Sequence, residues 1–225
     1  MPTPDTWAGY AERWSELHGG YDPRAASFFV RGWLFLAFQV SRRLARTPIG
    51  PDAVTVLGLA LSVGVPLAAG LGGAWPLLGA ALVLASALAD TADGALALLT
   101  DRVSRLGSVY DSAADSLSEA CWTVALVLVG APVWLAVAAG GVAWLHEYVR
   151  ARATVAGMAD LGTVTVGERP TRVIVVLFAL LVTGVLGVVH DSLTATAATV
   201  ATAVWALLGL LALGQLVVAV RRELR

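Results

Sequence analysis

The sequence predicts an all-α integral membrane protein, and three observations lead to this expectation. The chain of 225 residues is 58% hydrophobic and only 14% charged, whereas a soluble domain carries about 25% charged residues. Six charge-poor stretches each have the length of about 20 residues that a helix needs to cross a bilayer. All 15 basic residues are arginines, and they lie only between alternate stretches or near the ends of the chain. We therefore expect a bundle of six transmembrane helices.

The distribution of arginine also predicts the orientation of these helices. The expected spans lie near residues 53–72, 75–99, 107–130, 132–153, 172–190 and 193–219. The turns that follow the first, third and fifth spans contain no arginine. An excess of arginine marks the cytoplasmic side of a membrane. We expect a multi-pass protein of the cell membrane with both termini on the cytoplasmic side.

The segment that precedes the first span is expected to lie on the membrane surface. Residues 27–46 combine a run of aromatic residues with arginines near both ends, which is typical of an amphipathic helix in the plane of the cytoplasmic leaflet. Residues 1–26 fit either a short surface helix or disorder. The expected organisation is a cytoplasmic N-terminal segment with a juxtamembrane helix, a catalytic membrane domain and a cytoplasmic tail, over residues 1–46, 47–220 and 221–225.

Four aspartates interrupt the apolar pattern near the turn between the second and third spans. Asp90 and Asp93 are three residues apart, and Asp111 and Asp115 are four apart, so each pair shares one face of a helix. A carboxylate at the centre of a span is unfavourable by about 2.5–3.5 kcal/mol. We therefore expect a cation that compensates for these negative charges. Carboxylates without nearby histidine or cysteine suit Mg²⁺ or Mn²⁺, and such ions recruit diphosphates. A structural polar network and a cation-coupled transporter site are the alternatives.

The spacing of these residues resembles the CDP-alcohol phosphotransferase family (the class-I CDP-alcohol phosphatidyltransferases), whose signature is D-x2-D-G-x2-A-R-x8-G-x3-D-x3-D. The matching positions are Asp90, Asp93, Gly94, Ala97, Gly107, Asp111 and Asp115. The resemblance implies that the four aspartates hold one or two divalent ions on the diphosphate of a CDP-linked donor. It also implies that Asp115 is the general base that accepts the proton of the incoming alcohol.

The same resemblance implies a nucleotide-binding set around this motif. The segment P-D-A-V-T-V-L-G at residues 51–58 is similar to the family's segment that opens the first span. The implied nucleotide-binding residues are Asp52, Thr55, Gly94, Ala97 and Gly107. For Asp52 and Thr55, capping of the first span is an equally good interpretation.

One position departs from the family signature. The arginine that follows the alanine is Leu98 in this chain. Arg102, one helical turn later, and Arg105 are candidates to replace the missing charge. A non-catalytic relative that lost its activity with this arginine is a further alternative.

A second group of arginines flanks the turn between the fourth and fifth spans. Its members are Arg150, Arg152, Arg169 and Arg172. The strings Y-V-R-A-R-A and E-R-P-T-R around them resemble segments of actinobacterial phosphatidylinositol phosphate synthases. That resemblance implies a pocket for the phosphate of the acceptor alcohol, with inositol phosphate first and glycerol 3-phosphate second. The other interpretation is flanking charge that interacts with lipid headgroups.

These expectations combine into one predicted activity. The protein would transfer a phosphatidyl group, or a related substituted phosphoryl group, from a CDP-linked donor to a small polar alcohol and release CMP. CDP-diacylglycerol is the favoured donor, because a membrane-embedded site suits a lipid tail; a soluble CDP-alcohol with a lipid acceptor is the other possibility. Membrane lipids are expected partners, nucleic acid is not, and a homodimer is expected by analogy alone.

Overall fold

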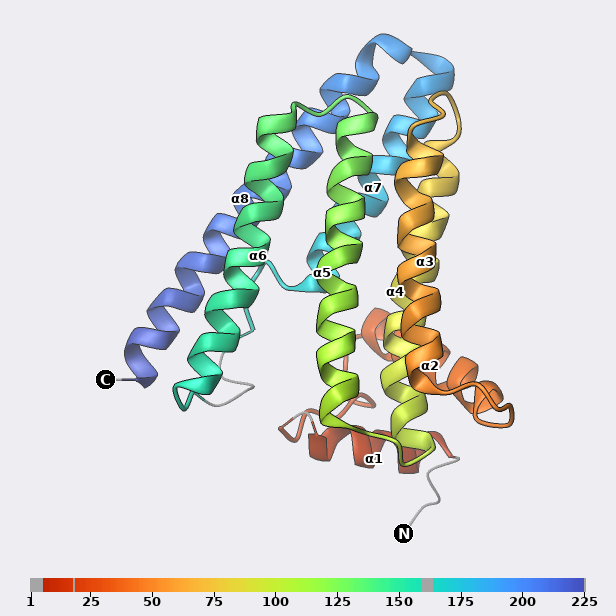
Figure 1. Cartoon of the computed structure of the whole chain (residues 1–225), viewed down its shortest axis with the longest axis vertical. Coiled ribbons are helices and arrows are strands. Elements are labelled where there is room, and N and C mark those ends of the chain that lie inside the picture. The colour runs from red at the N-terminus through yellow and green to blue at the C-terminus, as the bar shows by residue number, and fades with distance from the viewer. Residues whose placement is uncertain (1–5, 18, 159–163, 225) are drawn as a thin grey trace. The chain divides into compact units, whose positions relative to one another are not determined.

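The computed structural model describes residues 6–17, 19–158 and 164–224, and all regular elements in this part of the chain are helices (Figure 1). The elements are α1 (Trp7–Leu17), α2 (Phe28–Leu44), α3 (Pro51–Ala69), α4 (Pro76–Leu99), α5 (Arg105–Leu128), α6 (Val133–Val155), α7 (Arg169–Val189), the short 3₁₀ helix η1 (Asp191–Leu193) and α8 (Thr194–Glu223). The prediction of an all-α protein is confirmed for the described residues.

Each stretch that was expected to span a membrane forms a helix, but the helices differ in composition. Four are long and apolar enough to cross a bilayer: α3, α4, α7 and the segment Asp191–Glu223. The protein is therefore a multi-pass membrane protein. Helices α5 and α6 have 24 and 23 residues, yet they carry several charged side chains within that length. The count of six spans remains a prediction.

The N-terminal segment contains two helices where the sequence predicts surface structure. Helix α2 begins after Ser27, whose hydroxyl accepts a hydrogen bond from the backbone N–H of Val30. Arg42 and Arg43 lie in its last turn, where the negative end of the helix dipole stabilises positive charge. Helix α1 settles the choice between helix and disorder for residues 7–17. The position of α2 on a membrane is untested, and residues 1–5 of the expected N-terminal segment lie outside the described residues, as does residue 225 of the expected tail.

The chain divides into two compact units, and the first consists of Met1–Ala60 and Ala85–Asp115. It contains α1, α2, the start of α3, the end of α4 and the start of α5. Helix α1 packs across the end of α4 (Figure 1), where Tyr10 and Phe38 bury Leu98. The hydroxyl of Ser41 donates a 2.7 Å hydrogen bond to the carbonyl oxygen of Ala92 and joins α2 to α4. All four aspartates of the motif lie in this unit.

The second unit consists of Leu61–Leu84 and Ser116–Arg225. Its core is built around the buried indoles of Trp122 and Trp205, and α8 packs against α6 and α7. Lipid tails are as apolar as leucine, so close van der Waals contact rather than apolar burial stabilises such a bundle. At Gly184 an added Cβ would lie 2.8 Å from both Cγ and the backbone nitrogen of Leu77. Glycine is required there because the two helices approach so closely.

Candidate active site

Three carboxylates of the motif meet in the first unit. One carboxylate oxygen from each of Asp90, Asp111 and Asp115 lies within 4.8 Å of the other two. Two oxygens that bind one Mg²⁺ at 2.0–2.1 Å are separated by about 4.2 Å at most, so a small movement of side chains would allow all three to bind one ion. An all-oxygen set of anionic ligands suits a hard divalent cation, and the residues present therefore fit the metal that the motif implies.

The fourth aspartate of the motif has a different environment. Asp93 is buried, with 6% of its surface exposed, and it interacts electrostatically with Asp111 and Asp90. Its Oδ2 accepts a 2.6 Å hydrogen bond from the hydroxyl of Thr55 on α3. The structure thus joins Thr55, which the sequence suggested as a nucleotide-binding or capping residue, to one of the expected metal ligands. Both Asp52 and Thr55 lie inside α3, which begins at Pro51, so neither occupies the N-cap position.

The start of α3 lies beside the start of α5. An added Cβ on Gly107 would be 3.8 Å from Oδ1 of Asp52 and 3.0 Å from the hydroxyl of Ser104. Gly94 is exposed, and an added Cβ there would meet no atom within 4 Å. Ala97 is half-buried. Gly94 therefore leaves the backbone of α4 accessible, which is what close approach of a ligand needs.

One of the two candidate replacement arginines lies next to this region. Nη1 of Arg102 is 3.6 Å from the position that a Cβ on Gly50 would occupy, directly before α3. Both Arg102 and Arg105 are exposed, so their guanidinium groups are accessible to an anionic ligand.

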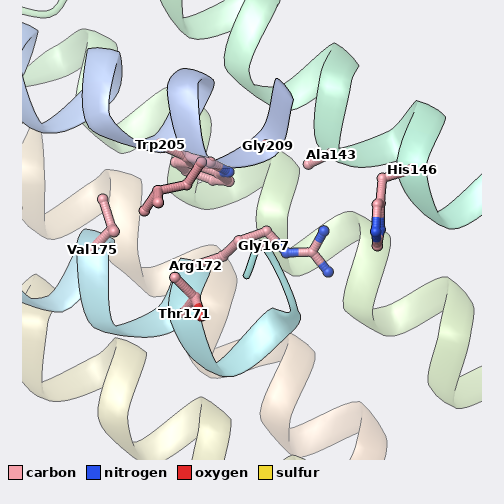
Figure 2. A pocket seen from close by; sticks show the side chains of 9 residues that line it. Ala143, His146, Gly167, Thr171, Arg172, Val175, Trp205 and Gly209 are labelled. Atoms are coloured by element: carbon pink, nitrogen blue, oxygen red, sulfur yellow. The ribbon is translucent and has the colours of Figure 1, made fainter. Parts of the chain in front are cut away.

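The second basic group lies in the other unit and is centred on a buried ion-pair network. Arg172 is 5% exposed. Its Nε lies 2.9 Å from Oε1 of Glu119, and its Nη2 lies 2.7 Å from Oε1 of Glu147. Arg172 lines a small cavity between α6, α7 and α8, together with His146 and Trp205, and Figure 2 shows its guanidinium extending toward His146.

Arg150 belongs to an adjoining set of polar contacts. It forms an ion pair with Glu168, the N-cap residue of α7. The same Oε1 of Glu168 accepts 2.8 Å hydrogen bonds from the backbone N–H and the hydroxyl of Thr165. Because the single proton of the Thr165 hydroxyl is used there, its contact of 3.0 Å with Nε2 of His146 requires the proton on that ring nitrogen.

The remaining two arginines of the group have different surroundings. The guanidinium carbon of Arg169 lies 5.9 Å from the ring centroid of the buried Trp122, within the range of a cation–π interaction. Arg152, in the last turn of α6, is exposed. All four arginines belong to the second unit. Two of them, Arg150 and Arg172, form ion pairs with glutamates.

Comparison with known proteins identifies the family. A family model described as CDP-alcohol phosphatidyltransferase matches residues 49–221. The chain belongs to the CDP-alcohol phosphatidyltransferase family. Among its relatives is the phosphatidylinositol phosphate synthase of Mycobacterium marinum, which is 32% identical over 151 residues; the match covers 61% of this chain and 61% of that protein. The synthase of Cutibacterium acnes is 31% identical over 202 residues, which are 86% of this chain and 96% of that protein.

A solved structure of the family shares the fold. The Mycobacterium tuberculosis phosphatidylinositol phosphate synthase in complex with manganese and citrate has a TM-score of 0.66 and 25% identity, and the match covers 82% of this chain and 88% of that one. The same protein with CDP-DAG bound also gives a TM-score of 0.66, at 24% identity, over 82% of this chain and 92% of that one.

Leu98, the position where this chain departs from the family signature, is buried rather than directed to solvent. It is 6% exposed and packs against α1. Its carbonyl oxygen accepts a 3.2 Å hydrogen bond from Nη1 of Arg13. No local sequence pattern indicates this contact, because Arg13 lies 85 residues earlier in the chain.

Three further residues of the site were not identified from sequence. Glu119 is one of them, and it pairs with Arg172. The other two are Glu168, which pairs with Arg150, and Thr165, whose hydroxyl donates a hydrogen bond to Glu168. The proximity of Glu168 to Arg169 in the sequence was the only available signal.

Proposed function

We propose that this protein transfers a phosphatidyl group from CDP-diacylglycerol to a small phosphorylated alcohol, of which inositol phosphate is the best candidate, and releases CMP. The meeting of Asp90, Asp111 and Asp115 within 4.8 Å, in a chain of this family, is the observation that carries the proposal. The names of the relatives support the choice of acceptor, with glycerol 3-phosphate second. The M. tuberculosis synthase with CDP-DAG bound supports the choice of donor through its shared fold.

The proposed reaction is a displacement at phosphorus. The hydroxyl oxygen of the acceptor attacks the β-phosphorus of the donor, a new P–O bond forms, and the P–O bond to CMP breaks. The carboxylate of Asp115 accepts the hydroxyl proton. Its position within the aspartate cluster, which is proposed to hold the diphosphate, supports this role.

The aspartates Asp90, Asp93, Asp111 and Asp115 are the proposed ligands of one or two Mg²⁺ or Mn²⁺ ions. When bound, such an ion neutralises the charge that develops on the phosphoryl oxygens and on the leaving group. A structural relative was solved with manganese, which supports Mn²⁺ as the first ion to test. Asp93 would contribute through the orientation that Thr55 imposes on it.

The nucleotide is proposed to lie along the starts of α3 and α5 and the exposed face of α4. Asp52 beside Gly107 would contact the cytidine, and Thr55 would contribute through Asp93. Gly94 and Ala97 would allow the donor to approach the backbone. Arg102, beside the start of α3, is the better placed of the two candidates to supply the charge that Leu98 lacks; Arg105 is the second.

The acceptor phosphate is proposed to bind at the arginines of the second unit. Arg152 is exposed, and Arg150 and Arg169 are half-buried, so these three are accessible to an anion. Arg172 is held by Glu119 and Glu147. It would contribute either through its electrostatic effect on the pocket, or by releasing one of these carboxylates and binding the phosphate instead. Forked guanidinium groups suit a phosphate monoester better than a neutral alcohol.

For the membrane arrangement, we propose six spans with both termini and the site on the cytoplasmic side. Helices α5 and α6 are as long as α4, and their charged residues include the expected ligands of the site, which explains their lower apolarity. Helix α2 would lie in the plane of the membrane within residues 1–46, followed by the catalytic membrane domain at 47–220 and the tail at 221–225. Helix α8 continues to Glu223, so the tail begins within that helix. A homodimer is proposed by analogy alone.

The decisive experiment measures CMP release by the detergent-purified protein with CDP-diacylglycerol, Mn²⁺ and a panel of acceptors. The panel contains inositol phosphate, glycerol 3-phosphate, free inositol and serine. Release that depends on inositol phosphate, and that is lost in Asp115→Asn while the thermal unfolding midpoint is kept, is the expected result. Lipid product should appear in equal amount with CMP.

Two outcomes would contradict the proposal. Absence of CMP with every acceptor, while Mn²⁺ still binds, would favour a non-catalytic member of the family. Metal or proton flux in liposomes without CMP release would favour a cation-coupled transporter.

A further inference from the structure

Helix α1 covers the position at which the family signature has its arginine. The side chain of Leu98 is buried together with Tyr10 of α1 and Phe38 of α2. A guanidinium group in this apolar contact would be desolvated without a partner, which is unfavourable. Leucine at position 98 is therefore compatible with a covering helix in a way that arginine is not.

The covering helix brings an arginine of its own to the same place. Nη1 of Arg13 donates a 3.2 Å hydrogen bond to the carbonyl oxygen of Leu98. Nη2 of Arg13 donates to Oδ1 of Asp101 at 2.8 Å. One guanidinium thus bridges the end of α4 and the turn that follows it, and its positive charge lies at the negative end of the helix dipole.

The turn that Arg13 contacts has a special backbone conformation. Asp101 has a φ of +57°, and among the described residues it is the only non-glycine residue with a positive φ. The backbone N–H of Arg102 donates to the carbonyl oxygen of Ala97 at 2.9 Å. This pattern is a Schellman motif, in which glycine is the usual residue at the left-handed position. An aspartate in that conformation is less favourable than glycine, and its exposed carboxylate pairs with Arg13 at 2.8 Å.

The residue directly after this turn is the one that would bind the donor. Arg102 follows Asp101, and its Nη1 lies beside Gly50 at the start of α3. The direction in which Arg102 leaves the turn depends on the conformation of Asp101, because the two residues share a peptide group. A change in the turn would therefore move the guanidinium of Arg102 away from the start of α3.

We propose that Arg13 is a positioning residue for Arg102: by bridging Leu98 and Asp101 it fixes the α4–α5 turn so that Arg102 is directed at the diphosphate of the donor. This inference rests on the proposed function. Helix α1, which precedes the residues matched by the family model, thereby becomes part of the donor site. Arg13 itself need not contact the substrate.

The kinetic test compares Arg13→Gln, Arg102→Gln and the double variant. We expect each single variant to raise the KM for CDP-diacylglycerol by about tenfold with kcat changed by less than about twofold, as for a lost binding contact. The double variant should match Arg102→Gln alone, because Arg13 acts through Arg102. Asp101→Asn should reproduce Arg13→Gln. Arg24→Gln is the matched control, since Arg24 pairs with Asp22 within the same N-terminal segment.

A second measurement is independent of activity. Amide hydrogen exchange reports the opening of local hydrogen bonds. Exchange of the Arg102 amide, which is bonded to Ala97, should become faster in Arg13→Gln and stay unchanged in Arg24→Gln. Unchanged exchange at residues 100–104 in Arg13→Gln would overturn the proposal, and so would multiplicative losses in the double variant. If no CMP is released by the unaltered protein, the proposed function fails, while the exchange result still decides whether Arg13 fixes the turn.

Discussion

The hydroxyl of Thr55 on α3 lies 2.6 Å from Oδ2 of Asp93 on α4 and donates a hydrogen bond to it. This contact orients a buried carboxylate of the motif. Removal of such an outer contact lowers metal affinity or activity by about 10–100-fold in known metal sites. We therefore predict that Thr55→Val, which keeps the shape and removes the donor, lowers kcat/KM by about that factor. The measurement is CMP release as a function of Mn²⁺ concentration.

Two variants control this prediction. Thr55→Ser keeps the hydroxyl and should retain most activity. Thr199→Val removes a hydroxyl that donates to the carbonyl oxygen of Ala195 in its own helix, and it should have no effect. An unchanged Mn²⁺ dependence in Thr55→Val would mean that the hydrogen bond does not matter for the metal.

Replacement of one carboxylate of the aspartate cluster should weaken metal binding directly. In Asp111→Asn a neutral amide replaces an anionic ligand, and we expect the Kd for Mn²⁺ to rise by more than about tenfold. Electron paramagnetic resonance of free Mn²⁺ measures this. Saturation at 100 times the Kd should stabilise the unaltered protein by about 2.7 kcal/mol, and EDTA should remove that gain. Asp191→Asn, in η1, is the control; equal Mn²⁺ affinity in both variants would argue against the site.

The ion pairs of Arg172 predict a large effect on stability. In Arg172→Leu, Glu119 and Glu147 would lose their guanidinium partner, and Glu119 would remain buried at 3% exposure. Breaking a buried ion pair on one side is unfavourable by about 3–5 kcal/mol. Unfolding in mild detergent should report this loss, and adding Glu119→Gln should restore part of it. Arg222→Leu, at the exposed end of α8, should be neutral. Similar unfolding midpoints for the two arginine variants would contradict the assignment.

The close approach at Gly184 predicts a packing defect. In Gly184→Ala the new methyl group would lie 2.8 Å from the backbone nitrogen of Leu77, so a helix must shift. Overpacking of this kind destabilises by about 1–3 kcal/mol. Thermal unfolding measures the change, with Gly141→Ala as the control because a Cβ there meets nothing within 4 Å. Equal stability of the two variants would show that the helices can separate without loss.

The helices were predictable because their signals are local. Apolar stretches bounded by arginine or glycine give the positions of α3 to α8 within a few residues. The composition of α5 and α6 is the exception, because the charged residues proposed for the site lie in these helices and lower their apolarity. The sequence does not decide between helix and disorder for α1, because a short amphipathic segment becomes stable only through packing. Here Tyr10 packs against Phe38.

The aspartates of the site were predictable because their spacing along two helices fixes the faces on which they lie. The contacts between distant segments were not. Nothing in the spacing of Thr55 indicates that it reaches Asp93, 38 residues later. In the same way, the linear sequence does not indicate that Arg172 of α7 pairs with Glu119 of α5. Such partners depend on the packing of helices, which a linear pattern does not specify.

The pairing of Arg172 with Glu119 and Glu147 has a consequence for biogenesis. The ribosome makes α5 and α6 before α7, so both acids leave the translocon before their common counter-charge exists. Glu119, which is 3% exposed, would disfavour transfer into lipid by about 2.5–3.5 kcal/mol at the centre of a span. If α5 and α6 span the membrane as proposed, Glu119 gains its counter-charge only when α7 joins them, and we expect these three helices to assemble as a group.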